Sequence, residues 1–260
     1  MAPRICVEDV SKIFTFIEQA YENAFIPIGF YGLLSKFVSK VKPSNLIIID
    51  GQESMIRTAF CTHVADYIAC KKKIPVAIFS LGLKKEEIIK MLVAFETRIE
   101  LHRLQSGILD EDAWRRIVHA MGVLGEKAPL YLDDAPVETM EEIGDRITKL
   151  KKESKIRLVI IDYLQHIGGM GRLHSYNERV EGIKIILYLK SLARKLNIPI
   201  IATSEASPSV GRDSNGRCIK KPEPSALWEE IRQYADLALY TSGKEIMEIY
   251  PEQEECNEPV

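Results

Sequence analysis

Five short apolar segments alternate along the chain with longer stretches of helical periodicity. Helical stretches are expected up to residue 69 and over 84–95, 138–152 and 177–196, and the apolar segments lie at residues 46–50, 75–81, 130–133, 158–162 and 199–204. A strand that is apolar along its whole length is buried on both faces, as in a parallel sheet with helices on either side. The alternation therefore predicts an α/β domain built on a parallel sheet.

Both ends of this pattern carry additional elements. Residues 237–240 and 246–250 are predicted to form a closing hairpin around residues 242–243. Residues 1–24 are predicted to form a separate amphipathic helix, which ends before Pro27 and whose apolar stripe consists of Val10, Ile13, Phe14 and Ile17. The sequence thus divides into a helix at 1–24, a main domain at 25–250 and an acidic tail at 251–260, which is expected to be disordered.

Composition excludes several classes of protein. The 260 residues include 35 Lys and Arg against 37 Asp and Glu, a formal net charge of −2, so nucleic-acid binding would depend on local basic loops. No apolar run approaches the roughly 20 residues that a membrane-spanning helix needs, and the N-terminus lacks the apolar core of a signal peptide. The five cysteines contain no C-x-x-C pair, and the five histidines are scattered. We therefore expect a cytoplasmic protein with reduced thiols and no membrane or histidine-based metal site.

The turn after the first predicted strand partly matches a phosphate-binding loop. Residues 51–58 read GQESMIRT, whereas the phosphate-loop pattern is G-x-x-x-x-G-K-[ST]. Gly51 and Thr58 match the pattern, but Ile56 and Arg57 replace its second Gly and its Lys. Another predicted strand ends in Asp162, a carboxylate that could bind Mg²⁺. Since parallel sheets bind ligands at the carboxyl ends of their strands, we expect a site there.

Several segments resemble the C-terminal RecA-type motor domain of DnaB-type replicative DNA helicases. Five segments are each similar to one pattern of the family. These are residues 26–30 (I-P-T-G-F in the family), 54–60 (S-M-G-K-T-A-F), 75–82 (P-V-x-x-F-S-L-E), 160–165 (I-x-I-D-Y-L-Q) and 189–199 (L-K-x-L-A-x-E-L-x-x-P). The resemblance covers almost the whole chain and implies a RecA-like P-loop NTPase fold. It also implies that helix 1–24 corresponds to the family's linker helix, which docks on a neighbouring subunit of a ring.

The resemblance implies a nucleotide site, which we expect to be weak or vestigial. Its ATP-binding positions are Gly51, Ser54, Arg57, Thr58 and Asp162, of which Thr58 and Asp162 would hold Mg²⁺. Structural alternatives remain open for both, since Thr58 may only cap a helix and Asp162 may only accept backbone N–H groups.

Four departures from the family pattern fall on this site. Ile56 and Arg57 change the phosphate loop, where we expect Ile56 to strain the backbone by about 1–2 kcal/mol and to crowd the anion. Gly82 replaces the Glu that activates the attacking water, and Glu205 replaces a Gln that senses the γ-phosphate. The family's K-x-R-N-G stretch, which carries its trans-acting fingers, has no counterpart in this sequence. These changes predict a domain without catalytic residues for ATP hydrolysis.

The resemblance implies DNA contacts in two flexible loops, at residues 168–172 and 211–221. The first includes Arg172, and the second carries Arg212, Arg217, Lys220 and Lys221. The alternative is that both are ordinary solvated loops. A further family element corresponds to residues 225–236, where Trp228 replaces an Arg.

The leading hypothesis is a helicase-like paralogue that binds DNA or an intact replicative helicase and forms at most a weak homo-oligomer through its N-terminal helix. The alternatives are an active ATP-dependent DNA helicase, and a structural oligomer.

Overall fold

The sheet is the central layer of the molecule. The computed structural model describes residues 43–51, 54–137, 139–169, 176–205, 209–212, 218–221, 227–242 and 245–249. Seven strands of this part of the chain form one sheet: β1 (Leu46–Gly51), β2 (Val76–Ser80), β3 (Leu130–Asp133), β4 (Leu158–Asp162), β5 (Ile200–Glu205), β8 (Leu237–Ser242) and β9 (Glu245–Ile249). Their order is β3-β2-β4-β5-β1-β8-β9, and each neighbouring pair is parallel except β8 and β9. The predicted parallel sheet and the closing hairpin are therefore confirmed.

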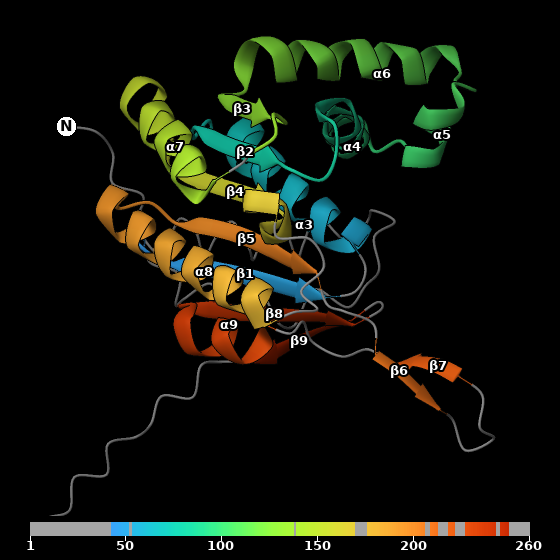
Figure 1. The fold of residues 1–260 in the computed structure, drawn as a ribbon. Helices are drawn as coiled ribbons and strands as arrows, with labels where there is room; N and C mark the ends of the chain where they lie inside the picture. The colour runs from blue at the N-terminus through green and yellow to red at the C-terminus, as the bar shows by residue number, and fades with distance from the viewer. Residues whose placement is uncertain are drawn as a thin grey trace, which may run out of the picture.

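Helices lie on both sides of this sheet (Figure 1). The α-helices among the described residues are α3 (Ser54–Asp66), α4 (Lys85–Thr97), α5 (Leu101–Ser106), α6 (Glu111–Gly122), α7 (Met140–Ser154), α8 (Tyr176–Leu196) and α9 (Trp228–Tyr234). Two short π-helical segments, η1 (Tyr67–Lys71) and η2 (Val123–Lys127), continue α3 and α6, and a 3₁₀ helix, η3 (Leu164–Gly169), follows β4. None of the helices in this part of the chain is long and apolar enough to cross a membrane.

Local sequence signals explain where several helices begin and end. The side chain of Asp110 accepts a hydrogen bond from the backbone N–H of Ala113 and so caps α6, and Thr139 caps α7 in the same way through Glu142. The first turn of α7 is acidic and its last turn is basic, which complements the helix dipole. The helix then ends at Lys155, which adopts a left-handed conformation.

Two apolar clusters cover the two faces of the sheet. Leu46 and Ile48 of β1 belong to the first cluster, together with residues of α7, α8 and α9. Ile47 and Ile49 belong to the second cluster, with residues of α3, η1 and α4. Since neighbouring strand residues point to opposite faces, a strand that is apolar throughout serves both clusters. This arrangement is the physical reason why β1, β2, β4 and β5 are buried along almost their whole length.

Other elements differ from the sequence predictions or were not predicted. Residues 211–221 were expected to be a flexible loop, but they include most of an antiparallel ribbon formed by β6 (Ser209–Arg212) and β7 (Cys218–Lys221). In Figure 1 this ribbon projects away from the main sheet. The helices α5, α6 and α9 were not predicted either. The expected helix at 1–24 and tail at 251–260 lie outside the described residues.

Candidate functional site

The candidate site lies at the carboxyl ends of three neighbouring strands, β4, β5 and β1. In the register of the sheet, Asp50 pairs with Ser204 and Gly51 pairs with Glu205. Asp162 ends β4 on the other side of β5. Parallel strands bring their ends to one edge of the sheet, so residues that are more than a hundred positions apart in sequence meet here.

At Gly51, the last residue of β1, the backbone lies close against Thr241 of β8. A Cβ atom at position 51 would lie 1.8 Å from the hydroxyl oxygen and 2.7 Å from the carbonyl oxygen of Thr241. The Thr241 hydroxyl lies 3.3 Å from the carbonyl oxygen of Asp50 and donates to it. A side chain at position 51 would therefore separate β1 from β8, which explains a glycine at the start of the turn.

Arg57 lies beneath this turn, inside the protein. It is only 1% exposed, and its Nη1 donates a hydrogen bond to the carbonyl oxygen of Gly51. Burial lowers the pKa of the guanidinium, whereas the nearby carboxylates of Asp162, Asp50 and Glu205 act in the opposite direction. The Arg57 side chain therefore supplies the positive charge among the carboxylates at the ends of these three strands.

The hydroxyl groups of two threonines bind the carboxylate of Asp162. Thr58 Oγ1 donates to Asp162 Oδ2 at 2.5 Å, and Thr203 donates to Oδ1. All three side chains are buried. A threonine hydroxyl beside a carboxylate offers the oxygen ligands that Mg²⁺ prefers, so the donor chemistry fits this ion. The predicted Mg²⁺ pair, Thr58 and Asp162, is thus brought together.

Two expectations about this segment are wrong. Thr58 does not cap a helix, because α3 begins four residues earlier, at Ser54. Ile56 lies within α3 and has no positive φ, and its half-buried side chain packs against the second apolar cluster. The expected backbone strain at Ile56 therefore does not occur, whereas the crowding of an anion stays a prediction. Ser54 itself is exposed at the first position of the helix.

The space next to Gly82 is filled by aromatic rings. A Cβ atom at position 82 would lie 2.7 Å from Cε1 of Tyr163 and 3.9 Å from Cε1 of His166. The rings of Tyr163 and His166 are in contact, with centroids 4.3 Å apart. Because the backbone N–H groups of Leu81 and Gly82 both donate to the carbonyl of Asp162, the turn after β2 is held against the end of β4. No sequence pattern indicated this aromatic pair.

Gln165 connects η3 to the end of β5. Its Nε2 donates to Ser204 Oγ at 3.0 Å and to the carbonyl of Glu205 at 3.3 Å, and its Oε1 accepts from the backbone N–H of Glu205 at 3.2 Å. The amide side chain thus binds the backbone of Glu205 through both its donor and its acceptor. Glu205 is exposed, and its carboxylate lies near enough to Arg57 to influence that guanidinium.

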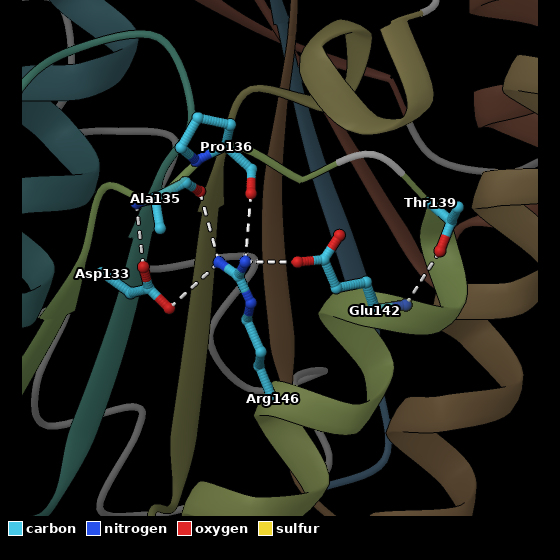
Figure 2. Close-up of polar contacts among 6 residues, drawn as sticks. All are labelled: Asp133, Ala135, Pro136, Thr139, Glu142 and Arg146. Carbon is cyan, nitrogen blue, oxygen red and sulfur yellow. Dashed lines mark hydrogen bonds and ion pairs between the residues drawn. The ribbon is translucent and has the colours of Figure 1, made fainter.

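A second cluster of polar contacts orders the turn between β3 and α7 (Figure 2). Arg146 of α7 donates to the carbonyl oxygens of Ala135 and Pro136 at 3.3 and 3.0 Å, and it forms ion pairs with Asp133 and Glu142. Figure 2 shows its guanidinium between the two carboxylates.

This turn also contacts the start of α4. The side chain of Asp134 accepts a hydrogen bond from the backbone N–H of Lys85 at 3.0 Å, while α4 has no side-chain cap from Lys84. The turn between β3 and α7 is therefore bonded to the start of α4, the helix that follows the loop carrying Gly82.

The residues expected to bind DNA are placed only in part. Arg212 ends β6, and Lys220 and Lys221 end β7, opposite Val210 and Ser209. Arg172 and Arg217 lie outside the described residues. Trp228, which stands where the family has an Arg, is buried in the first apolar cluster and packs edge-on against Tyr240, with ring centroids 5.5 Å apart. Position 228 therefore serves the core.

Comparisons with known proteins agree with this architecture. The family model "DnaB-like helicase C terminal domain" matches residues 26–258. The replicative DNA helicase DnaB of Nostoc sp. (strain PCC 7120) is 39% identical over 195 residues, which are 74% of this chain and 21% of that protein. DnaB of Geobacillus stearothermophilus is 35% identical over 217 residues, or 83% of this chain and 46% of that protein. The chain thus spans less than half the length of these two relatives.

Two solved structures share the fold. One, described as an ATPase domain, superposes with a TM-score of 0.65 and 22% identity, covering 93% of this chain and 84% of that one. A DnaB-like replicative helicase, described with its interactions with primase, has a TM-score of 0.64 and 25% identity, covering 92% of this chain and 56% of that one. With a family model that covers most of the chain and a RecA-like sheet that places Gly51, Thr58 and Asp162 at one edge, the chain belongs to the DnaB-like helicase C-terminal domain family.

Proposed function

We propose that this domain is a helicase-like binding protein of DNA replication that does not hydrolyse ATP by the route its family uses. The observation that carries the proposal is at position 82. Gly82 has no carboxylate to activate water, and Tyr163 fills the space into which a side chain would extend. A lost general base costs about 10²–10⁴ in rate.

Nucleotide binding is expected to be weak. Arg57 already donates to the carbonyl of Gly51, and the exposed carboxylate of Glu205 adds negative charge beside the place where phosphate would bind. The Thr58–Asp162 pair still offers ligands for Mg²⁺, so ATP and Mg²⁺ are weak ligands in this proposal.

Thermal unfolding with and without millimolar MgATP tests this proposal. A ligand at about 100 times its Kd adds about 2.7 kcal/mol, and we expect a much smaller effect. For a domain of this size that free energy would raise the Tm by roughly 5–11 °C, at about 2–4 °C per kcal/mol. A shift of that size, or DNA-stimulated release of phosphate at the rates of a helicase, would contradict the proposal. The matched control is Asp162→Asn, which weakens the Mg²⁺ ligand set and should remove any shift that reflects MgATP.

The second candidate is an active ATP-dependent DNA helicase domain. It is favoured by the close contact between Thr58 and Asp162, which is compatible with an intact Mg²⁺ site. Phosphate release measured with and without single-stranded DNA separates the two candidates, because only the active enzyme should be stimulated.

DNA is one proposed partner, bound through the β6–β7 ribbon. Three basic residues, Arg212, Lys220 and Lys221, lie on its two short strands. Charge-driven DNA binding weakens as salt rises, with a slope that depends on the number of phosphates contacted. Fluorescence anisotropy of labelled single-stranded DNA should give weak, salt-dependent binding that Lys220→Glu with Lys221→Glu abolishes. Binding that the double variant retains would exclude the ribbon.

A second copy of the chain is another proposed partner. On α6, Trp114, Val118 and Met121 are 53%, 70% and 50% exposed and lie at i, i+4 and i+7, on one helical face. We propose that this stripe accepts the apolar residues of segment 1–24 from a neighbouring chain. Light scattering over a range of concentrations should detect a weak oligomer. Deleting residues 1–23, or introducing Val118→Lys, should dissociate it, whereas assembly that survives both changes would require another surface.

A further inference from the structure

His166 lies next to Tyr163, beside the place that a side chain at position 82 would take. Its Cε1 lies 3.9 Å from the place where a Cβ of residue 82 would be, and its ring contacts Tyr163. The side chain is exposed, unlike those of its neighbours Gln165 and Ile167, which are buried. An imidazole is thus found near the turn where the family has a glutamate.

The hydrogen bond made by this imidazole fixes its tautomer. His166 Nδ1 lies 2.7 Å from the carbonyl oxygen of Leu81. A carbonyl oxygen can only accept, so Nδ1 carries the proton and donates. In the neutral ring Nε2 then bears the lone pair and can take up a proton. This is the arrangement in which a backbone carbonyl holds a histidine ready to act as a base.

We propose that His166 Nε2 replaces the family glutamate as the proton acceptor for a slow hydrolysis of nucleoside triphosphate at this site. The inference rests on the proposed weak nucleotide site at the ends of β1 and β4. It differs from the proposed function in one respect, because the site then hydrolyses nucleotide slowly by a route that the family does not use. The oxygen of a water attacks the γ-phosphorus, and the proton of that water passes to Nε2. The bond from the γ-phosphorus to the bridging oxygen breaks, its electron pair stays on the nucleoside diphosphate, and the imidazolium releases its proton to solvent.

Two substitutions separate this chemical role from a structural one. In His166→Asn the amide nitrogen can still donate to the Leu81 carbonyl, as Nδ1 does, but no acceptor remains at the position of Nε2. In His166→Gln the amide reaches the region of Nε2 but cannot act as a base at neutral pH. If His166 only supports the turn through Leu81, His166→Asn should behave as the wild type.

The experiment measures phosphate release by the full chain at saturating MgATP, with Asp162→Asn as the background. We expect slow wild-type turnover that falls about 100-fold or more in both His166→Asn and His166→Gln, the effect of removing a general base. Free imidazole should restore part of the rate to His166→Gly, and the KM should change little. Wild-type turnover that His166→Asn retains would overturn the inference. No wild-type turnover above background would overturn the inference but leave the proposed function standing.

A second readout does not depend on activity. Nitrogen-15 chemical shifts of the His166 ring report which nitrogen carries the proton, and we expect Nδ1–H in the neutral form. Adding a non-hydrolysable ATP analogue with Mg²⁺ should shift the Nε2 resonance in the wild type but not in Asp162→Asn. A neutral ring protonated on Nε2, or an Nε2 resonance that the analogue does not shift, would overturn the assignment.

Discussion

Replacing Arg57 by methionine should destabilise the fold even without any ligand. Arg57 is 1% exposed and supplies a positive charge near the carboxylates of Asp162, Asp50 and Glu205. Removing one partner from a buried charge arrangement typically costs about 3–5 kcal/mol, because the remaining charge stays buried. Asp162 keeps its hydrogen bonds from two threonine hydroxyls, so we expect the lower end, about 3 kcal/mol.

Chemical denaturation in urea, with thermal melts as a second measurement, gives this free energy. At about 2–4 °C per kcal/mol, a loss of about 3 kcal/mol lowers the Tm by roughly 6–12 °C. Arg57→Lys keeps the charge but loses the fork that reaches the carbonyl of Gly51, so its loss should be smaller, about 1–2 kcal/mol. The matched control is Arg115→Met on α6, an exposed arginine paired with Glu111, which should change stability by at most about 0.5 kcal/mol.

A double-mutant cycle identifies the partner. If Arg57 compensates Asp162, then Asp162→Asn should destabilise the Arg57→Met background less than it destabilises the wild type, by about 0.5–3 kcal/mol. The reasoning is refuted if Arg57→Met behaves like the exposed control, or if the two substitutions add without coupling. Either result would mean that these carboxylates need no positive charge from Arg57.

Three further predictions test other contacts. Gly51→Ala should lower the free energy of unfolding, measured in urea, by about 1–3 kcal/mol. Adding Thr241→Ala to this variant should restore only part of the lost stability, because the backbone carbonyl oxygen of residue 241 still lies 2.7 Å from the new Cβ. Arg146→Leu should lower the free energy of unfolding by about 1–2 kcal/mol and speed hydrogen exchange at the amides of Ala135 and Lys85. Unchanged exchange at Lys85 would show that the Arg146 cluster does not stabilise the start of α4. Gly82→Glu should destabilise the domain rather than restore turnover, and Tyr163→Ala in the same chain should relieve that loss, as differential scanning calorimetry would measure.

The sheet was predictable because its strands are buried on both faces. Such strands must be apolar along their whole length, and this pattern stands out in the sequence at residues 46–50 and 158–162. The helices α5 and α6 were harder to predict, because α6 buries only Ala113 and Ala120 and leaves larger apolar side chains in solvent. The apolar residues of α6 do recur at helical spacing, so the pattern indicates an amphipathic helix, but it does not show which of these residues face the core.

The sequence predicted only those parts of the candidate site that a single residue can indicate, such as a carboxylate at the end of a predicted strand. Asp162 and Thr58 were paired through the resemblance to the family, and the structure brings their side chains into contact. The error at Ile56 arose because matching a motif does not reveal where the helix begins. The contact of Tyr163 with Gly82 depends on packing between two segments 81 residues apart, which no local pattern records.

Gln165 has a consequence for how the domain can vary. Through one amide it binds η3 to the last residue of β5, and the chain leaves these two elements at residues 170 and 206. The segments that follow residues 169 and 205 therefore start from two points that β4, β5 and the Gln165 side chain hold together. Insertions or deletions beyond those points need not disturb the spacing of Asp162, Thr203 and Glu205, so both connections can change in length while the strand ends stay in place.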